Sequence, residues 1–399
     1  MLKKILIIAA LVLIAGGFII SRSPLGSILI KSVKTGFILH PGGYLAAFLP
    51  SGKGLPVDRI TLPSGFRISI YADNLPGARS LARGEKGTVF VGTRSEGKVY
   101  AVADTSGNGR ADVEYIIAEG LNSPNGVAIK GGDLYIAEIS RIIRIRGIED
   151  NLTKTPEPEI VFDGYPEDRH HGWKFIAFGP DSLLYVPIGA PCNICEEKDP
   201  YATITRLDIR KGEFDIFARG IRNTVGFDWH PETGNLWFTD NGRDWLGDDR
   251  PPDELNTAPA PGMHFGFPYC HGTDIKDPDI EGPGCGEFIA PEIELGPHVA
   301  ALGMRFCRSD MFPENYRNSI FIAEHGSWNR TVPIGYRIIQ VDMERSSPGR
   351  PEIFAQGWLE GNRSWGRPVD LLFLPDGSML VSDDKAGAVY RITYHKSGK

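Results

Sequence analysis

The sequence predicts an all-β fold, a six-bladed β-propeller, and two observations carry that prediction. The composition of this 399-residue chain, with 48 glycines and 30 prolines, suits many tight turns better than long helices. One strand phrase, a turn residue followed by a short apolar and aromatic run, also recurs six times. It stands at 87–91, 133–137, 183–186, 235–239, 319–323 and 378–382. Such a recurrence of short strands and turns is typical of the radial sheets of a propeller.

The spacing between the phrases indicates the size of each blade. Most successive phrases lie about 45 to 60 residues apart, which fits four strands per blade. The interval after 235–239 is much longer, and it marks an inserted loop at 244–297 that is rich in Pro, Gly and Asp. Long loops in compact domains usually have a function or are disordered, and the aromatic residues of this loop argue against disorder.

The two ends of the propeller are expected to meet in one blade. Residues 66–71 and 389–393 both alternate between apolar and polar side chains, as half-buried strands do. Pairing these two strands would close the ring and remove its free edges. The propeller domain is therefore expected at 59–399, with its functional loops at one end of a central channel.

The N-terminus has the features of a targeting or anchoring segment. Lys3 and Lys4 precede an uncharged run at 5–20, which is shorter than the roughly 20 residues of a membrane-spanning helix. Residues 1–22 are therefore interpreted as a signal peptide or a membrane anchor. We expect a retained anchor, with the folded part exported to the periplasm or another extracytoplasmic space. Residues 23–58 are expected to be a linker or a segment that lies along the membrane surface.

The charge and the cysteines narrow the choice of partners and compartment. A formal net charge of −7 offers no basic surface for nucleic acid, so nucleic acid is not expected as a partner. An exported chain permits disulfides, and Cys270 and Cys285, in one loop rich in Pro and Gly, are the most plausible pair. Cys192 and Cys195 lack the second pair that a zinc site needs. Cys307 is most simply a buried thiol.

Two motifs contain residues suited to catalysis. The stretch 169–173, Arg-His-His-Gly-Trp, ends just before a predicted strand, where His171 is well placed as a general base because the pKa of His lies near neutrality. A histidine without a role is the alternative interpretation. Arg222 and Asn223 stand between glycines and offer a planar cationic fork and an amide, which suit a carboxylate or a quinone oxygen. A salt-bridged turn is the alternative there.

Four further segments offer ligands or polar groups. Segments 239–244 and 253–256 cluster carboxylates and turn carbonyls, the hard oxygen ligands that Ca²⁺ takes, although an acidic loop without metal is equally compatible. Segments 324–330 and 366–370 each stand next to a repeated strand phrase. Both are therefore expected to present polar groups at the same end of the ring, with a hydrogen-bond network that closes the blade as the alternative.

Taken together, these motifs resemble the soluble-type glucose/sorbosone dehydrogenase family, whose members are quinoprotein sugar dehydrogenases that use pyrroloquinoline quinone. The resemblance runs from about Leu62 to Thr393. It is carried, in order, by His171 before Phe-Gly-Pro-Asp at 178–181, Gly-Ile-Arg-Asn at 220–223, Asn-Gly-Arg at 241–243, Asp-Glu-Leu-Asn at 253–256 and Gly-Arg-Pro-Val-Asp at 366–370. Several matches in the right order are more specific than any one of them.

The resemblance implies a six-bladed propeller with the quinone lying flat over the channel and Ca²⁺ bound to the oxygens of the quinone. His171 would then take the proton from the anomeric hydroxyl of a sugar, and Arg222 would stabilise negative charge that develops on the quinone. The other positions implied around the cofactor are Arg94, Asn223, His325, Asn329, Arg330 and Arg367. The implied calcium ligands are the backbone carbonyls of Gly242 and Arg243, together with the acidic position Glu254.

One position departs from the family pattern. Sugar dehydrogenases of this family carry an Asp that orients the histidine base, whereas this chain has Ala190 there. A base without its orienting carboxylate is expected to risk the wrong tautomer or a different angle. Asp168 and Glu196 are the candidates to replace that carboxylate. The resemblance also implies that the segment 192–195 lies near the cofactor, where a disulfide would pack on the ring.

Three functions are compatible with the sequence. The leading hypothesis is an exported, membrane-anchored quinoprotein dehydrogenase that oxidises an aldose or a related hydroxyl-bearing substrate and passes electrons to an acceptor. A calcium-dependent lactonase on a similar propeller is the first alternative, and it requires several side-chain metal ligands that converge on the channel. The second alternative is a noncatalytic propeller that binds a carbohydrate or a protein through the inserted loop.

Overall fold

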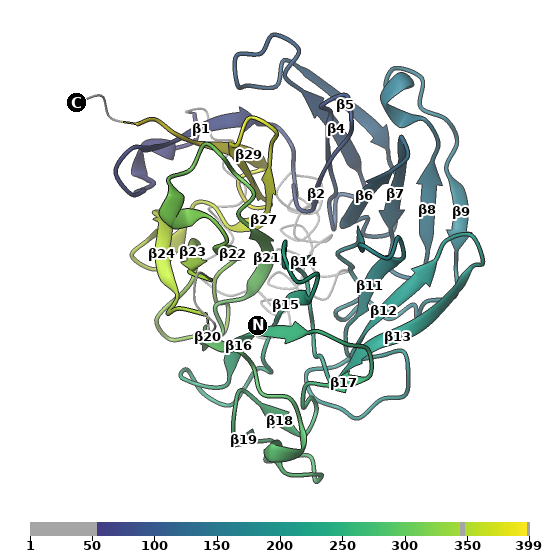
Figure 1. Ribbon diagram of the computed structural model, residues 1–399, viewed down its shortest axis with the longest axis vertical. Coiled ribbons are helices and arrows are strands. Elements are labelled where there is room, and N and C mark those ends of the chain that lie inside the picture. Colours follow the sequence, from purple (N-terminus) through teal and green to yellow (C-terminus); the bar gives the residue numbers. More distant parts are fainter. Residues whose placement is uncertain (1–53, 344–347, 397–399) are drawn as a thin grey trace, which may run out of the picture. The chain divides into compact units, whose positions relative to one another are not determined.

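A computed structural model describes residues 54–343 and 348–396 of the chain. These residues form the predicted six-bladed β-propeller, with the sheets arranged around a central axis (Figure 1). The segment 1–22, expected to be a signal peptide or an anchor, and most of the linker at 23–58 lie outside the described residues. Within the described part, no helix is long and apolar enough to span a membrane.

Each blade contains four antiparallel strands, ordered from the innermost at the channel to the outermost at the rim. Blade 1 consists of β2 (Leu81–Arg83), β3 (Val89–Val91), β4 (Val99–Ala103) and β5 (Val113–Ala118). Blade 2 consists of β6 (Gly126–Lys130), β7 (Asp133–Ala137), β8 (Ile142–Ile145) and β9 (Glu159–Phe162). Blade 3 consists of β10 (Ala177–Phe178), β11 (Leu184–Ile188), β12 (Thr203–Asp208) and β13 (Glu213–Arg219), with β17 (Met263–His264) added in parallel at its edge.

The second half of the chain repeats this arrangement. Blade 4 consists of β14 (Phe227–Trp229), β15 (Leu236–Asp240), β16 (Pro252–Ala258) and β20 (Ile293–Pro297). Blade 5 consists of β21 (Ala301–Phe306), β22 (Ile320–Glu324), β23 (Arg337–Val341) and β24 (Glu352–Gln356). Blade 6 consists of β27 (Pro368–Phe373), β28 (Met379–Asp383), β29 (Ala388–Tyr394) and β1 (Phe66–Ala72).

Short elements connect or decorate the blades. Two small hairpins pair β18 (Cys270–His271) with β19 (Ile275–Lys276) and β25 (Leu359–Glu360) with β26 (Arg363–Ser364). The helical elements of the described residues are single 3₁₀ turns: η1 (Val57–Arg59), η2 (Ile148–Asp150), η3 (Cys285–Glu287) and η4 (Glu314–Tyr316). The prediction of an all-β fold is therefore confirmed.

Every one of the six strand phrases forms the second strand of its blade, namely β3, β7, β11, β15, β22 and β28. These strands are apolar along their length because neighbouring blades cover both of their faces. In β15, Leu236 and Phe238 pack with residues of blade 3, whereas Trp237 packs with residues of blade 5. A buried cluster of this kind lies between each pair of adjacent blades. Apolar side chains thus fill the space between the blades, and polar side chains lie at the ends of the channel.

The ring closes as predicted, by pairing of the two ends of the domain. Strand β1 pairs antiparallel with β29, from Phe66 opposite Tyr394 to Ala72 opposite Val389. Figure 1 shows the purple β1 beside the yellow β29 in blade 6. The first strand of the domain therefore supplies the outermost strand of the last blade, and the ring leaves no unpaired edge between its first and last blades.

The segment 244–297 differs from the expected inserted loop, because it supplies two strands of blade 4. Strand β16 carries Asp253 and Glu254, and β20 ends the segment. Strand β16 is buried although its sequence contains charged residues. Asp253, for example, accepts hydrogen bonds from the backbone N–H groups of Gly242 and Ala301 at 2.9 and 3.2 Å. The chain added to the blade is therefore 259–292, which carries β17, the β18–β19 hairpin and η3.

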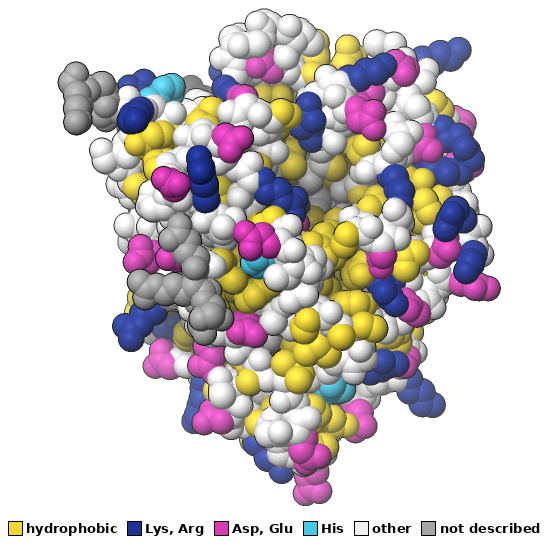
Figure 2. Space-filling model, viewed as in Figure 1, with side chains coloured by type: hydrophobic (Ala, Val, Ile, Leu, Met, Phe, Trp, Pro, Cys, Tyr) yellow, Lys and Arg dark blue, Asp and Glu magenta, His cyan; other side chains and the backbone are white. Residues whose placement is uncertain are grey.

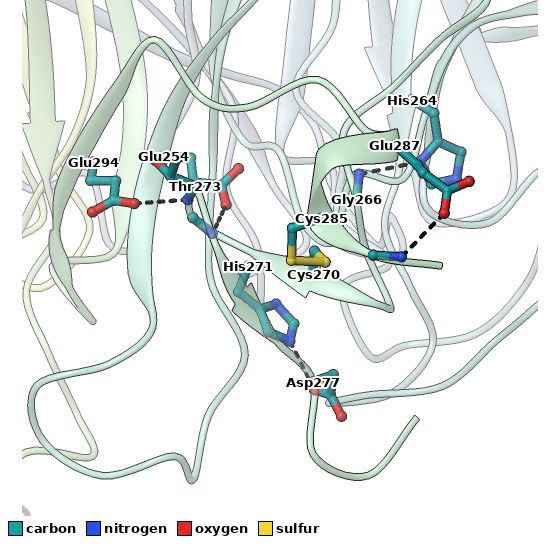
Figure 3. The surroundings of a disulfide bond; sticks show 12 residues. Glu254, His264, Gly266, Cys270, His271, Thr273, Asp277, Cys285, Glu287 and Glu294 are labelled. Carbon is teal, nitrogen blue, oxygen red and sulfur yellow. Dashed lines mark hydrogen bonds and ion pairs between the residues drawn. A yellow bond between two sulfur atoms is a disulfide. The ribbon is translucent and has the colours of Figure 1, made fainter. Parts of the chain in front are cut away.

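The added chain is held by the predicted disulfide between Cys270 and Cys285 (Figure 3). Beside this bond, His271 points to Asp277, with its Nε2 atom 2.8 Å from the carboxylate. A second disulfide joins Cys192 to Cys195. The remaining cysteine of the described residues, Cys307, is a buried free thiol. The expectation for the free thiol is confirmed.

One end of the channel combines aromatic side chains with Arg83, Arg305 and Arg308. Figure 2 shows a face of the molecule with a central hollow that is bordered by hydrophobic and by Lys or Arg side chains. A cavity of about 480 Å³ lies at the C-terminal ends of the innermost strands, lined in part by Phe178, Trp229, Phe306 and Phe373. The polar motifs of the sequence do not line this cavity. They lie instead at the other end of the strands.

Candidate functional site

The predicted site residues are brought together by the topology of the blades. The first two strands of every blade are antiparallel, so the loop before the first strand and the loop after the second lie at the same end. In blade 4, for example, Phe227 at the start of β14 pairs with Phe238 near the end of β15. Ten predicted site residues lie in such loops: Arg94, His171, Arg222, Asn223, Gly242, Arg243, His325, Asn329, Arg330 and Arg367. The eleventh, Glu254, pairs with Asp240 at the same end of blade 4.

His171 is held rigidly in the loop that precedes β10. It is buried, and its backbone φ of 51° lies in the left-handed region that residues other than Gly rarely adopt. Gly189, directly after β11, allows this close approach, because a Cβ atom on Gly189 would lie 2.5 Å from that of His171. The ring of Trp173 meets the imidazole edge to face at 6.1 Å between centroids. The imidazole therefore has little freedom to turn.

A backbone carbonyl sets the tautomer of His171. Its Nδ1 atom lies 2.8 Å from the oxygen of Ala190. Since a carbonyl oxygen only accepts, Nδ1 carries the proton and Nε2 carries the lone pair of a base. The expectation of a poorly oriented base is thus corrected, because the backbone of the substituted residue does the orienting. Neither of the other candidates is needed: Asp168 accepts from Tyr201 and Glu196 interacts with Tyr269.

The protonation state of His171 follows from its surroundings. Burial holds the pKa of His171 well below its usual value, and the positive charge of Arg222 and the neighbouring His170 lower it further. The hydrogen bond to Ala190 opposes these effects only in part. The imidazole is therefore neutral at neutral pH, which is the state that a general base requires.

The guanidinium of Arg222 is buried and fully engaged. Its Nε and Nη2 atoms donate to the backbone oxygen and the Oδ1 atom of Asn193, both at 2.9 Å. Its Nη1 atom donates to the backbone oxygen of Asn241 at 3.1 Å, and Nη2 also lies 3.3 Å from a carboxylate oxygen of Asp244. Burial lowers the pKa of Arg222, and Asp244 is the foremost of the carboxylates that oppose this shift. The result is a fixed positive charge close to the base.

Asn193 is the residue around which this part of the site is assembled. It stands inside the loop closed by the Cys192–Cys195 disulfide. Besides its two bonds from Arg222, its Oδ1 atom accepts the backbone N–H of Asp244 at 2.8 Å, and its Nδ2 atom donates to the backbone oxygen of Asp244 at 3.1 Å. The disulfide loop therefore connects blade 3 to the segment after β15.

Asp240 fixes the backbone of the Arg222–Asn223 turn. Its two carboxylate oxygens accept the N–H groups of Arg222 and Asn223, at 2.8 and 2.6 Å. Burial raises the pKa of Asp240 to about 7 despite these two bonds. Asn241 completes the turn, because its Nδ2 atom donates to the backbone oxygen of Asn223 at 2.9 Å.

Gly242 and Arg243 present backbone oxygens at this end of the channel. Within the described residues, neither carbonyl accepts a hydrogen bond. The guanidinium of Arg243 turns into the added chain, where it pairs with Asp277 at 2.6 Å and Asp279 at 3.0 Å. The Arg243 side chain is thus structural, and only its carbonyl is free for a cation.

The carboxylate of Glu254 is already used within blade 4 and the added chain. Its two oxygens accept from the backbone N–H of Gly272 at 2.7 Å and from the Nδ2 atom of Asn256 at 3.0 Å. Burial raises the pKa of Glu254 to about 8. Across the part of the chain that the structure describes, no group of three or more His, Cys, Asp or Glu side chains is arranged to hold a metal ion.

A second group of side chains carries an excess of positive charge. The guanidinium of Arg94 stacks over Trp173, 4.4 Å from the ring centroid, and makes no hydrogen bond or ion pair with any described residue. The guanidinium of Arg367 donates only to the backbone oxygens of His325 and Gly326 within the described residues. Burial lowers the pKa of Arg94 to about 10, and other nearby guanidiniums contribute to the shift. Within the described residues, both cations therefore lack a carboxylate partner.

Asp384 is the carboxylate that balances this group in part. It pairs with Arg79 at 2.6 Å and with the Nε2 atom of His325 at 2.8 Å. Burial lowers the pKa of His325 to about 4, with a further contribution from Arg367, so this histidine is neutral at neutral pH. Of the three guanidiniums of Arg79, Arg94 and Arg367, only that of Arg79 therefore pairs with a carboxylate of the described residues, and this surplus of positive charge suits an anionic ligand.

Asn329 and Arg330 fasten the loop after β15 and are not drawn into the cationic group. The Nδ2 atom of Asn329 donates to Asp244 at 2.7 Å, so it supports the carboxylate that contacts Arg222. Arg330 donates to the backbone oxygen of Asp248 and pairs with Asp249 at 3.3 Å. Their contacts indicate a positioning role for Asn329 and a structural role for Arg330.

Three residues of the site have roles that the sequence prediction missed: Asn193, Arg79 and Asp384. Asn193 has a local signal, because a polar residue between two closely spaced cysteines is held by any disulfide that they form. Arg79 lies in the loop before β2, as Arg367 lies in the loop before β27, so its place in the loop before a first strand could have revealed it. Asp384 follows its strand phrase directly, in the place where His325 follows another.

The chain matches two family models. The model described as glucose/sorbosone dehydrogenase matches residues 137–327, and a model described as TrAA12-like matches residues 277–395. An uncharacterised protein of Borreliella burgdorferi is 33% identical over 369 residues, which cover 88% of this chain and 96% of that protein.

Two further similarities concern proteins with assigned activities. A pyrroloquinoline quinone-dependent pyranose dehydrogenase of Coprinopsis cinerea is 31% identical over 124 residues, which cover 26% of this chain and 16% of that protein. The solved holo form of the pyranose dehydrogenase quinone domain from the same organism superimposes with a TM-score of 0.71 at 18% identity, over 84% of this chain and 97% of that one. This structural likeness shows the shared fold. With the family-model match and the ordered motifs, these findings show that the chain belongs to the glucose/sorbosone dehydrogenase family.

Proposed function

We propose that the protein is a pyrroloquinoline quinone-dependent sugar dehydrogenase that oxidises an aldose or a related hydroxyl-bearing substrate. The observation that carries this proposal is the juxtaposition, through Trp173, of a neutral histidine and an arginine that has no hydrogen-bond or ion-pair partner among the described residues. Trp173 contacts both the His171 ring and the Arg94 guanidinium. A base and an anion-binding group at one channel mouth suit a substrate hydroxyl beside an anionic cofactor.

The residues present fit an anionic quinone. Pyrroloquinoline quinone is a planar ring system that carries several carboxylates, and the guanidiniums of Arg94 and Arg367, which pair with no carboxylate of the described residues, have the charge to hold them. Trp173 and Arg222 would complete the contacts. When bound, the quinone would supply the two-electron oxidant that takes a hydride from the hydroxyl-bearing carbon.

Calcium is compatible with backbone oxygens at the same end of the channel. Ca²⁺ takes carbonyl and carboxylate oxygens, and the carbonyls of Gly242 and Arg243 accept no hydrogen bond from described residues. We propose that these two carbonyls contribute to a calcium site that the cofactor oxygens complete. Glu254 would act on that site through the backbone of its segment, because both of its oxygens already have partners.

His171 would perform the proton transfer. Oxidation of an alcohol to a carbonyl releases a proton from the hydroxyl and a hydride from the carbon, and Nε2 of His171 is the atom available to take the proton. The hydrogen bond from Nδ1 to Ala190 would stabilise the imidazolium formed. Arg222, held by Asn193, would keep a fixed positive charge beside the reacting atoms without needing to reorganise.

Export, a membrane anchor at 1–22 and a separate electron acceptor remain part of the proposal, on the evidence of the sequence pattern. The lactonase alternative requires converging side-chain metal ligands, and the described residues contain no such cluster. The alternative of a noncatalytic propeller is less compatible with a buried histidine whose tautomer is set for proton uptake.

The proposal is tested with the purified full-length chain. Pyrroloquinoline quinone is titrated with and without Ca²⁺ while the absorbance of the quinone is followed, and a panel of aldoses is then added with a dye acceptor. We expect Ca²⁺-dependent binding and sugar-dependent reduction of the dye. An absence of quinone binding under both conditions, with no dye reduction by any aldose, would overturn the proposal.

A further inference from the structure

Two solvent-exposed tryptophans, Trp245 and Trp328, lie beside the candidate site. Trp245 is 67% exposed and Trp328 is 64% exposed, and they are the exposed members among the aromatic side chains of the described residues. Their rings meet edge to face, 5.3 Å apart between centroids and at 87°. Most large aromatic side chains are buried, so two exposed indoles in mutual contact indicate a binding surface.

The backbones that carry these indoles are firmly held. Trp245 follows Asp244, which has hydrogen bonds to Asn193, Asn329 and Arg222. Its own backbone φ of 72° lies in the left-handed region, which is unusual for an aromatic residue. The two rings are therefore presented by a fixed scaffold.

Trp328 is anchored in the same way. Ser327 before it is buried and exchanges two hydrogen bonds with Ile334: its N–H donates to the Ile334 oxygen at 2.9 Å, and its Oγ atom accepts the Ile334 N–H at 3.0 Å. Asn329 after it donates to Asp244 at 2.7 Å. The Asn329–Asp244 bond therefore joins the residue after one tryptophan to the residue before the other.

This pair of indoles is continuous with the candidate active site. Asp244, the neighbour of Trp245, lies 3.3 Å from the guanidinium of Arg222. Charged groups also lie close in sequence to the two tryptophans, where Arg330 pairs with Asp249. A ligand that extends outward from Arg222 would thus meet two aromatic faces and then a polar rim.

We propose that Trp245 and Trp328 form an outer sugar subsite, so that the substrate is an oligosaccharide whose terminal unit reaches His171 and whose next unit rests on the indoles. This inference rests on the proposed function for the inner site. The apolar C–H face of a pyranose packs on an aromatic ring, and its hydroxyls suit a border of carboxylates and guanidinium.

The size of the surface favours a sugar over a protein partner. Two partly exposed indoles offer roughly 300 Å² of ring surface. A specific protein interface needs about 800 Å² on each partner. A sugar ring matches the smaller area, and the adjacent site supplies the chemistry for its neighbour.

Binding is tested separately from oxidation. The methyl glycosides of cellobiose and maltose lack a free anomeric hydroxyl, so they bind without being oxidised, and exposed indoles report their binding through fluorescence. We expect saturable quenching in the wild-type chain. The affinity for the methyl glycosides that it reports is expected to fall at least fivefold in Trp245→Ala and in Trp328→Ala. The matched control is Ile160→Ala, which removes an exposed apolar side chain from the outer strand of blade 2.

Oxidation then locates the subsite relative to the inner site. For the reconstituted holoenzyme, we expect either tryptophan variant to raise KM for cellobiose or maltose about five- to tenfold, the effect of losing one aromatic contact, with less than a twofold change for glucose. Equal effects on glucose and the disaccharides, or no effect on either, would overturn the inference. A change only in the rate of electron transfer to an acceptor would overturn it too and would indicate a docking surface instead.

The two proposals fail in different ways. Quenching by the methyl glycosides without oxidation of any aldose would refute the dehydrogenase and leave the subsite supported. Oxidation of aldoses without quenching and without a difference between glucose and the disaccharides would refute the subsite and leave the dehydrogenase supported.

Discussion

The base side of the site, His171 with Arg222, differs from the cation side, Arg94 with Arg367, in how its charges are balanced. On the base side, the Nδ1 atom of His171 is hydrogen-bonded to Ala190. The Arg222 guanidinium is hydrogen-bonded to Asn193, Asn241 and Asp244. On the cation side, within the described residues, Arg94 has no such partner and Arg367 has only backbone oxygens.

The difference indicates a division of labour. A proton acceptor must have one tautomer and one orientation before the substrate arrives, so its surroundings are complete in the protein alone. A binding group for an anionic ligand must keep unused hydrogen-bonding capacity. Burial lowers the pKa of Arg94 to about 10, and the repulsion from Arg79 and Arg367 contributes to this shift. Substitutions on the two sides should therefore separate catalysis from cofactor binding.

The largest expected effect is on turnover, from the base side. His171→Ala is expected to lower kcat by roughly 10²- to 10⁴-fold, because general-base catalysis contributes that much, while the Kd for pyrroloquinoline quinone changes little. Steady-state dye reduction and quinone titration measure the two quantities. His170→Ala is the matched control, since its exposed ring lies against His171 without the Ala190 bond. Unchanged turnover in His171→Ala would remove this residue from the mechanism.

The second effect is on cofactor affinity, from the cation side. Arg94→Met keeps much of the side-chain length and removes the charge, so the Kd for pyrroloquinoline quinone is expected to rise about ten- to a hundredfold, the effect of losing a hydrogen bond to a charged group. The melting temperature is expected to stay the same, because Arg94 makes no hydrogen bond in the described residues. A variant that binds quinone like the wild type would show that this arginine has another role.

The third prediction compares the two disulfides. Replacing Cys192 and Cys195 by Ser frees Asn193, so kcat is expected to fall about tenfold through misplacement of Arg222, with a small loss of stability. Replacing Cys270 and Cys285 by Ser opens a longer loop in the added chain (Figure 3), which should lower the free energy of unfolding by about 3 kcal/mol with kcat largely kept.

Denaturant unfolding of both double variants measures the free energy of unfolding, and dye-linked kinetics measure kcat. Equal kcat values in the two double variants would contradict the positioning role given to Asn193. A larger loss of stability in the variant without the Cys192–Cys195 bond would instead show that this disulfide contributes more to the free energy of unfolding than the Cys270–Cys285 bond does.

The smallest expected effect is the position of the acidic limb in a pH profile. In the proposed mechanism neutral His171 is the active form, so activity is expected above its folded pKa and is expected to be lost as the pH falls through that value. Burial holds this pKa well below 6.5, so kcat/KM is expected to remain level from neutrality to below pH 6.5 before it declines. A decline centred at or above pH 6.5 would contradict the buried, neutral state of the base.

The fold was predictable because its periodicity is local. Each strand phrase combines a turn residue with an apolar run, and burial on both faces of a second strand makes that run continuous in any propeller. The segment for which the sequence pattern misleads is β16, which reads as part of the inserted loop. Asp253 and Glu254 look like loop residues, yet buried N–H groups satisfy both carboxylates.

The sequence by itself determined the six blades, the closure of the ring through 66–71 and 389–393, the Cys270–Cys285 disulfide, and the loops from which the site is built. These features depend on patterns within short stretches of chain. Only the tertiary structure decided which groups in those loops meet. The carbonyl that orients His171, the amide that holds Arg222, and the lack of any partner for Arg94 among the described residues all depend on which loops the folded blades bring together. Backbone oxygens carry no residue-specific signal, and an unpaired charge is defined by what surrounds it, so neither is visible in a linear sequence.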